Sequence, residues 1–309
     1  MNLSFSRSAI LIFITTLLCA SESAYAADDW NFKSSFNIGF RTLDFGQDFE
    51  QGTLYYQNLP AIQSAARTTD YKVDFKSIDL TLAAAWKQWF ATFNYERSLD
   101  TQDGTFDSTY ASSNGNPASH GQASFAFDRE DFAFTLGWNA VGGLSIFTGY
   151  KYGQTDTSRP AKTLNQAPIY ASSSFKEDGP FAGLGYSWAI GHGILTTSVA
   201  YAYMNGKFSS QGEELIFQTA NSALTYEALN YNGHTDGLSC NLSWNVQATD
   251  SIGYYYGVKY QHYSFNADTS ETWKLYDLQN TNTYLFSGNG KVNNVDTVTA
   301  FYAGVNYTF

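Results

Sequence analysis

The chain has 309 residues, within the range of one large all-β domain, and its formal net charge is −11. An acidic chain without basic clusters is a poor candidate for nucleic-acid binding. Only 15% of the residues are charged while 17% are aromatic, and the mean hydropathy is slightly polar at −0.30. Rings with an apolar body and a polar tip are typical of proteins that meet lipid headgroups along two belts.

Residues 1–26 have the pattern of a secretory signal peptide. Arg7 supplies the positive charge, an apolar run too short for a membrane span follows it, and residues 24–26 form a small-x-small cleavage site. We therefore predict export and a mature domain of residues 27–309.

The chain offers little cysteine chemistry. Cys19 leaves with the predicted signal, and Cys240 then remains alone, so we expect neither an intramolecular disulfide nor a cysteine metal cluster in the mature chain. No metal-ligand spacing or phosphate-binding glycine loop stands out elsewhere, and we predict no metal and no cofactor.

The mature chain alternates apolar and polar residues. No stretch reaches the roughly 18 apolar residues of a helical span, and a closed β-barrel is the other structure that satisfies every backbone group in hydrocarbon. Alternation is clear over residues 78–86, 238–246 and 252–260, and this period of two is typical of a tilted transmembrane strand. We predict an all-β fold, a closed antiparallel up-and-down transmembrane β-barrel of ten strands. The predicted strands are residues 30–42, 71–86, 88–99, 122–139, 143–156, 174–190, 193–209, 234–247, 251–267 and 294–309.

The connections between these strands are alternately short and long. The long ones are rich in Ser, Thr, Asn, Gln, Gly and Asp. They are residues 43–70, 100–121, 157–173, 210–233 and 268–293. Because transmembrane barrels have short periplasmic turns and long external loops, this order predicts both termini in the periplasm.

Some details of the architecture stay open. The apolar parity switches near Lys76-Ser77 and near Asp128, which predicts β-bulges at the outer rim. Twelve strands are possible if residues 43–70 or 268–293 contain a hairpin. A soluble β-sandwich or lipocalin-like barrel is the alternative, but its exposed face would be highly charged. The polar face here is mostly Gly, Ala, Ser, Asn and Thr, which favours a narrow lumen.

The end of the chain carries a resemblance. Phe309 is the last residue, Tyr307 lies two residues earlier and Gly304 five residues earlier. This resembles the C-terminal assembly signal of Gram-negative outer-membrane β-barrel proteins, and residues 128–152 and 175–188 resemble proteobacterial members of that group. The resemblance implies insertion by the barrel assembly machinery and contact with outer-membrane lipid and lipopolysaccharide. We expect a monomer.

Charged residues on the inward parity define the first candidate site. They are Lys33, Arg41, Asp79, Glu96, Arg129, Asp131, Lys151 and Lys259. Paired with one another they would close the lumen, because an unpaired buried ion is costly. Arranged around water they would select small charged solutes, as in a porin-like channel. Ten strands lie just above the size at which side chains fill a barrel, so we favour an occluded or narrow lumen.

A catalytic alternative rests on two acid and base clusters. His234 and Asp236 share one strand face near the outer rim, and Asp100 and Asp103 lie at the top of another strand. Ten-stranded barrel proteases of the omptin family use a His–Asp couple that faces an Asp pair across an external groove, where the carboxylates activate water. The family's couple runs Asp-x-His, whereas this chain has His-Thr-Asp. We therefore predict no enzymatic activity, with an omptin-like surface hydrolase, protease or lipid hydrolase, as an alternative.

The predicted loops contain many aromatic residues among polar ones. They are Tyr55, Tyr56, Tyr110, Tyr170, Phe217, Tyr226, Tyr231, Trp273, Tyr276, Tyr284 and Phe286. Loops on a rigid scaffold commonly bind ligands, and rings among amides suit carbohydrate or protein surfaces. The same rings could instead pack over the barrel mouth. We predict a non-enzymatic barrel whose loops or narrow lumen handle an external ligand.

Overall fold

The computed structural model describes residues 32–55, 64–99, 102–112, 119–164, 167–218, 222–277 and 282–308. The predicted signal peptide lies outside these residues. The described part of the chain is almost entirely β-strand. Its elements are β1 (Phe32–Tyr55), β2 (Ser64–Trp86), β3 (Trp89–Ser98), β4 (Gln102–Ser112), β5 (Ser119–Asn139), the 3-10 turn η1 (Val141–Gly143), β6 (Leu144–Leu164), β7 (Ala167–Ile190), β8 (Gly193–Gln218), β9 (Ser222–Gln247), β10 (Ile252–Asp277) and β11 (Asn282–Thr308). No helix within this part is long and apolar enough to cross a membrane.

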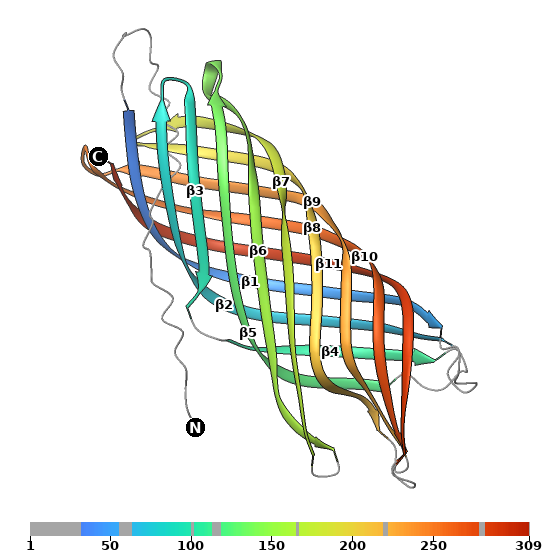
Figure 1. Cartoon of the computed structure of the whole chain (residues 1–309). Coiled ribbons are helices and arrows are strands. Elements are labelled where there is room, and N and C mark those ends of the chain that lie inside the picture. Colours follow the sequence, from blue (N-terminus) through green and yellow to red (C-terminus); the bar gives the residue numbers. More distant parts are fainter. Residues whose placement is uncertain are drawn as a thin grey trace.

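The strands pair antiparallel around one curled sheet (Figure 1). Strand β1 pairs with β2 on one side and with β11 on the other. Strands β3 and β4 lie end to end between β2 and β5, so the eleven strands of the described residues occupy ten positions, against the ten strands predicted. We call the enclosed side of this sheet the lumen.

The prediction of long external loops is wrong for most of the residues concerned. Segment 100–121 contains β4, and the segments predicted as the other four loops continue the strands on either side of them. No extra hairpin occurs in the described parts of 43–70 or 268–293, where β1, β2, β10 and β11 simply continue. Alternating apolar residues mark only the part of a strand that contacts lipid, and backbone pairing continues beyond the point where this alternation ends. A transmembrane strand needs about 9–11 residues, whereas β7 to β11 have 24 to 27.

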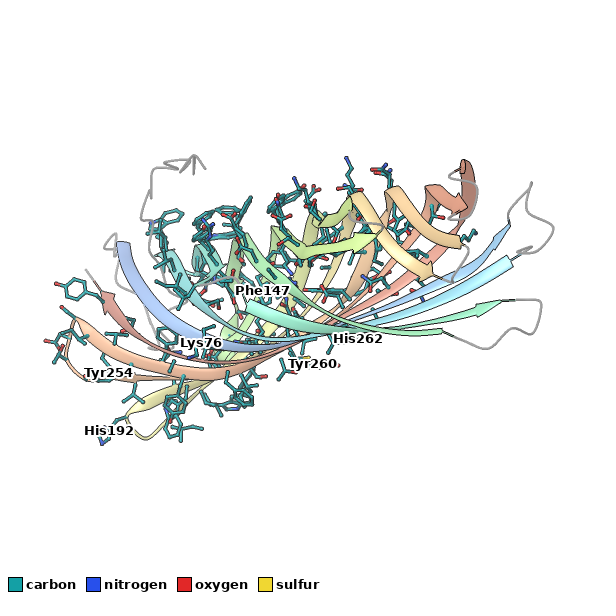
Figure 2. The ribbon with its side chains drawn as sticks, turned by 90° about the horizontal axis from the view of Figure 1, so that it is seen from below. Lys76, Phe147, His192, Tyr254, Tyr260 and His262 are labelled. Carbon is teal, nitrogen blue, oxygen red and sulfur yellow. The ribbon has the colours of Figure 1, made fainter. Side chains whose placement is uncertain are left out.

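Side chains on the outer wall form an apolar band with aromatic rings on either side. Along β8 the exposed Val199 is followed by the exposed Tyr201 and Tyr203, and along β7 the exposed Leu184 precedes Trp188 near the turn to β8. Figure 2 shows Tyr254 and Tyr260 outside the sheet and Phe147 inside it. This is the distribution of a wall that meets lipid.

The parity switches near residues 76–77 and 128 are not bulges of β2 or β5. Phe127 and Arg129 are both buried on the lumen side, as are Val73 and Ser77, so each strand keeps its parity through the switch. At both places the neighbouring strand changes from β3 to β4. The pairing register of β2 and of β5 with this neighbour changes at the same point. On β2 and β5 the apolar residues change sides because their lumen-side residues become apolar at this height, as at Val73 and Phe127.

The apolar band predicts a strong dependence on position for an added charge. We expect Leu184→Arg to lower the free energy of unfolding from lipid vesicles by about 2–4 kcal/mol, as for a cation at the bilayer midplane. An arginine introduced on the outer wall beyond the apolar band, Asn205→Arg, should change the free energy of unfolding little. Equal effects of the two substitutions in urea titrations would contradict this placement of the lipid band.

Candidate functional site

A layer of buried charged side chains crosses the lumen. Arg129 on β5 lies 2.7 Å from Asp131 on the same strand, measured from Nε to Oδ2. Its other nitrogens lie 3.5 Å from Asp296 on β11 and 3.8 Å from Glu177 on β7. These three strands stand at separate positions around the sheet. Arg129 therefore links distant parts of the wall through the interior, and only 4% of its side chain is exposed.

Lys151 on β6 is the second cation of this layer. Its Nζ lies 3.4 Å from Glu177 and 3.7 Å from Asp131, and it sits 4.6 Å from the ring centroid of Tyr263 on β10. We call Arg129, Asp131, Lys151, Glu177 and Asp296 the ion layer. Each of its carboxylates contacts at least one of the two cations.

The strand register explains why the layer contains so many carboxylates. Asp79 is directly opposite Glu96, which is opposite Asp131, which is opposite Gly153, which is opposite Glu177. Four acidic residues thus follow one cross-strand row on the lumen side. Like charges directly opposite each other are destabilising, so this row requires cations from neighbouring rows.

Gly153 leaves space within this row. A Cβ at this position would lie 2.7 Å from Oδ1 of Asp131 and 3.2 Å from Oε1 of Glu177. Any side chain would push the two carboxylates away from the cations that they share.

Buried aromatic residues lie in the lumen immediately beyond the ion layer. Phe127 lies two residues from Arg129, Phe175 two residues from Glu177, and Phe265 two residues from Tyr263, which contacts Lys151. At most 3% of each of these three phenylalanines is exposed. The rings of Phe175 and Phe265 meet edge to face at 5.2 Å. Phe208 and Tyr231 stack at the same spacing. We call these five residues the aromatic layer.

A cavity of about 280 Å³ occupies the lumen on the other side of the ion layer. It lies toward the short turns that join β2 to β3, β5 to β6, β7 to β8 and β9 to β10. Asp131, Lys151 and Tyr263 border it at the ion layer. Ser145, near the start of β6, and Asn245, near the end of β9, border it close to the turns.

The structure describes six of the eight predicted lumen charges as side chains. Asp79 and Glu96 are buried, and Ser77 donates a hydrogen bond to Glu96. Lys259 is half-buried and borders the cavity with them. Lys33 and Arg41 lie on β1, but their side chains are outside the described residues.

Sequence reasoning missed Glu177 and Asp296. Both lie in predicted strands, 174–190 and 294–309, on the parity that faces the lumen. Applying the parity rule to every charged residue of these strands would have found them, whereas the sequence offered no signal for which acid pairs with Arg129.

The proposed His–Asp couple does not face the lumen. His234 and Asp236 lie on the outer face of β9, because Thr235 between them is buried and Leu238 is exposed. Tyr201 donates a hydrogen bond of 3.0 Å to Asp236, and the ring of Tyr203 stacks on His234. The couple therefore points away from the lumen, and the hypothesis that it faces Asp100 and Asp103 across an external groove stays a prediction. Asp100 and the side chain of Asp103 lie outside the described residues.

Other predicted elements have mixed outcomes. Of the aromatic residues predicted for loops, Tyr231 is the one whose side chain is described, and it belongs to the aromatic layer. In the assembly signal, Tyr307 is exposed on the outer wall and Gly304 is half-buried, while Phe309 lies outside the described residues. Among the described residues no group of three or more His, Cys, Asp or Glu is arranged to hold a metal ion.

Comparison with solved structures finds outer-membrane barrels. The outer-membrane protease OmpT of Escherichia coli superposes with a TM-score of 0.65 at 13% identity, covering 92% of this chain and 99% of that one. OprG of Pseudomonas aeruginosa has a TM-score of 0.35 at 10% identity and covers 90% and 95%. No protein-family model matches the chain, and no curated protein does. The fold is that of outer-membrane β-barrel proteins, which supports an outer-membrane location.

Removing the central cation tests the ion layer. We expect Arg129→Met to destabilise the protein by about 3–5 kcal/mol, because it leaves Asp131, Glu177 and Asp296 with less compensation in a buried site. Arg97 lies 3.8 Å from Asp128 with both side chains about half exposed, and Arg97→Met should cost under about 1 kcal/mol. Urea unfolding in lipid vesicles measures both, and similar small costs would contradict a desolvated ion layer.

Proposed function

We propose that this chain is a non-enzymatic outer-membrane barrel that does not conduct solutes, because the ion layer and the aromatic layer occlude its lumen. The observation that carries the proposal is the contact of Arg129 with both Asp296 and Glu177, which joins opposite parts of the wall. Two successive layers of different chemistry, one paired charges and one packed rings, leave ions and apolar solutes alike without a favourable path.

The long strands support a second part of the proposal. Strands of 24 to 27 residues extend well beyond the bilayer, so the barrel presents a tall wall to the outside. We propose that its outer end handles the external ligand. We further propose a monomer, exported by residues 1–26, inserted through its C-terminal signal and surrounded by lipopolysaccharide.

Planar-bilayer recordings distinguish this proposal from the porin-like alternative. We expect wild-type protein to produce no discrete current steps after its insertion has been verified by co-flotation with vesicles. Phe127→Ala combined with Arg129→Ser should open both layers and produce steps, provided that heat-modifiable electrophoresis shows a folded barrel. Reproducible steps from the wild type would overturn the proposal in favour of a channel.

The OmpT neighbour is a protease, and it supplies the second candidate function, a surface hydrolase. The orientation of His234 and Asp236 does not favour a hydrolase that uses this couple in the lumen, because both side chains face outward. We expect the wild type to cleave neither a peptide panel nor a phospholipid panel. Cleavage that His234→Ala or Asp236→Ala abolishes would revive the hydrolase, and cleavage that persists in both would require another catalytic group.

A further inference from the structure

The cavity between the ion layer and the short turns has parts of different chemistry in its lining. Phe90 on β3, Phe147 on β6 and Phe181 on β7 border one side. Ser198 on β8 and Asn241 on β9 border another. Strands β3 and β9 lie across the lumen from each other, because five strand pairings separate them in either direction around the sheet. Three phenylalanine rings therefore face a surface of hydroxyl and amide groups, and tyrosines of β10 and β11 complete the lining.

Glycines keep the aromatic rings flat against their wall. A Cβ on Gly137 would lie 2.0 Å from Cζ of Phe90, and a Cβ on Gly183 would lie 2.5 Å from Cζ of Phe147. The register shows that one cross-strand row alternates ring and glycine: Phe90, Gly137, Phe147, Gly183. Each ring therefore lies over the neighbouring glycine and leaves the middle of the lumen free. Rings projecting across the lumen would have filled this space.

The opposite wall continues the same row with small residues. Gly183 is opposite Ala200, and Ala200 is opposite Ser239. Asn241 accepts a hydrogen bond of 2.7 Å from Tyr302, which fixes the orientation of its amide. The wall of β8 and β9 is thus short, polar and uncharged along the cavity.

The charged residues that border the cavity are Asp79, Glu96, Asp131, Lys151 and Lys259. Asp131 and Lys151 belong to the ion layer, Asp79 and Glu96 belong to the acidic row beside it, and Lys259 acts electrostatically on Asp131. A charged ligand would have to compete with these existing partners, whereas an uncharged ligand would not.

We propose that this cavity is a binding cup for an uncharged sugar that enters from the side of the short turns. A sugar ring has an apolar face that packs on aromatic rings and hydroxyl groups that hydrogen-bond to short polar side chains, which are the two walls present here. The proposal rests on the proposed function only in that the ion layer closes the cup toward the outside.

Filling the cup gives the sharpest test, with a matched control one residue away. Ser198→Phe places a ring in the cavity, whereas Val199→Phe places the same ring on the lipid-facing wall, where Val199 is exposed. Binding of glucose, N-acetylglucosamine and maltose is measured by saturation-transfer NMR and calorimetry in a sugar-free amine-oxide detergent. Glutamate and putrescine serve as charged probes.

We expect at least one of the sugars to bind the wild type and Val199→Phe with equal affinity, and to bind Ser198→Phe at least about tenfold more weakly. A second measurement uses Ser198→Cys in a Cys240→Ala background, where the same sugar should slow maleimide labelling of the new thiol. Absence of sugar binding by the wild type, equal binding by Ser198→Phe, or tighter binding of a charged probe would overturn the cup. If no sugar binds and the wild type gives no current steps in planar bilayers, the binding cup is wrong and the occluded barrel is retained. Current steps from the wild type would instead overturn the closed end.

Discussion

The need to neutralise a row of carboxylates that faces the lumen determines how the charged side chains of this structure are arranged. Asp79, Glu96 and Asp131 lie directly opposite one another on adjacent strands, and Glu177 continues the row beyond Gly153. Such a row is unfavourable in the interior unless cations reach it. Arg129 and Lys151 come from the rows on either side, and Arg129 extends far enough to contact Asp296 as well.

This arrangement divides the lumen into three zones along its axis. The aromatic layer lies on one side of the ion layer, and the cavity with its uncharged wall lies on the other. The division also accounts for the outer wall, which is apolar beside the cavity and polar beside the aromatic layer. The outer wall therefore changes from apolar to polar near the ion layer, whereas aromatic rings line the lumen on both sides of that layer.

The sequence predicted the orientation of side chains better than the extent of the strands. Period-two alternation placed Asp79, Arg129 and Lys151 on one side of the wall, and the structure buries all three. It did not predict that β8 continues to Gln218, because residues 210–218 show no alternation of apolar and polar residues. The pairing of Arg129 with Asp296 was also out of reach, since it depends on which strands face each other across the lumen. A single chain without its three-dimensional register contains no signal for that contact.

A double-mutant cycle between Arg129 and Asp296, measured by urea unfolding in lipid vesicles, tests the central claim most directly. If the two groups stabilise each other across the lumen, Arg129→Met combined with Asp296→Asn will be less destabilising than the sum of the single substitutions, with a coupling above about 0.5 kcal/mol. Additive effects would mean that the two side chains do not interact, and that the ion layer does not join opposite parts of the wall.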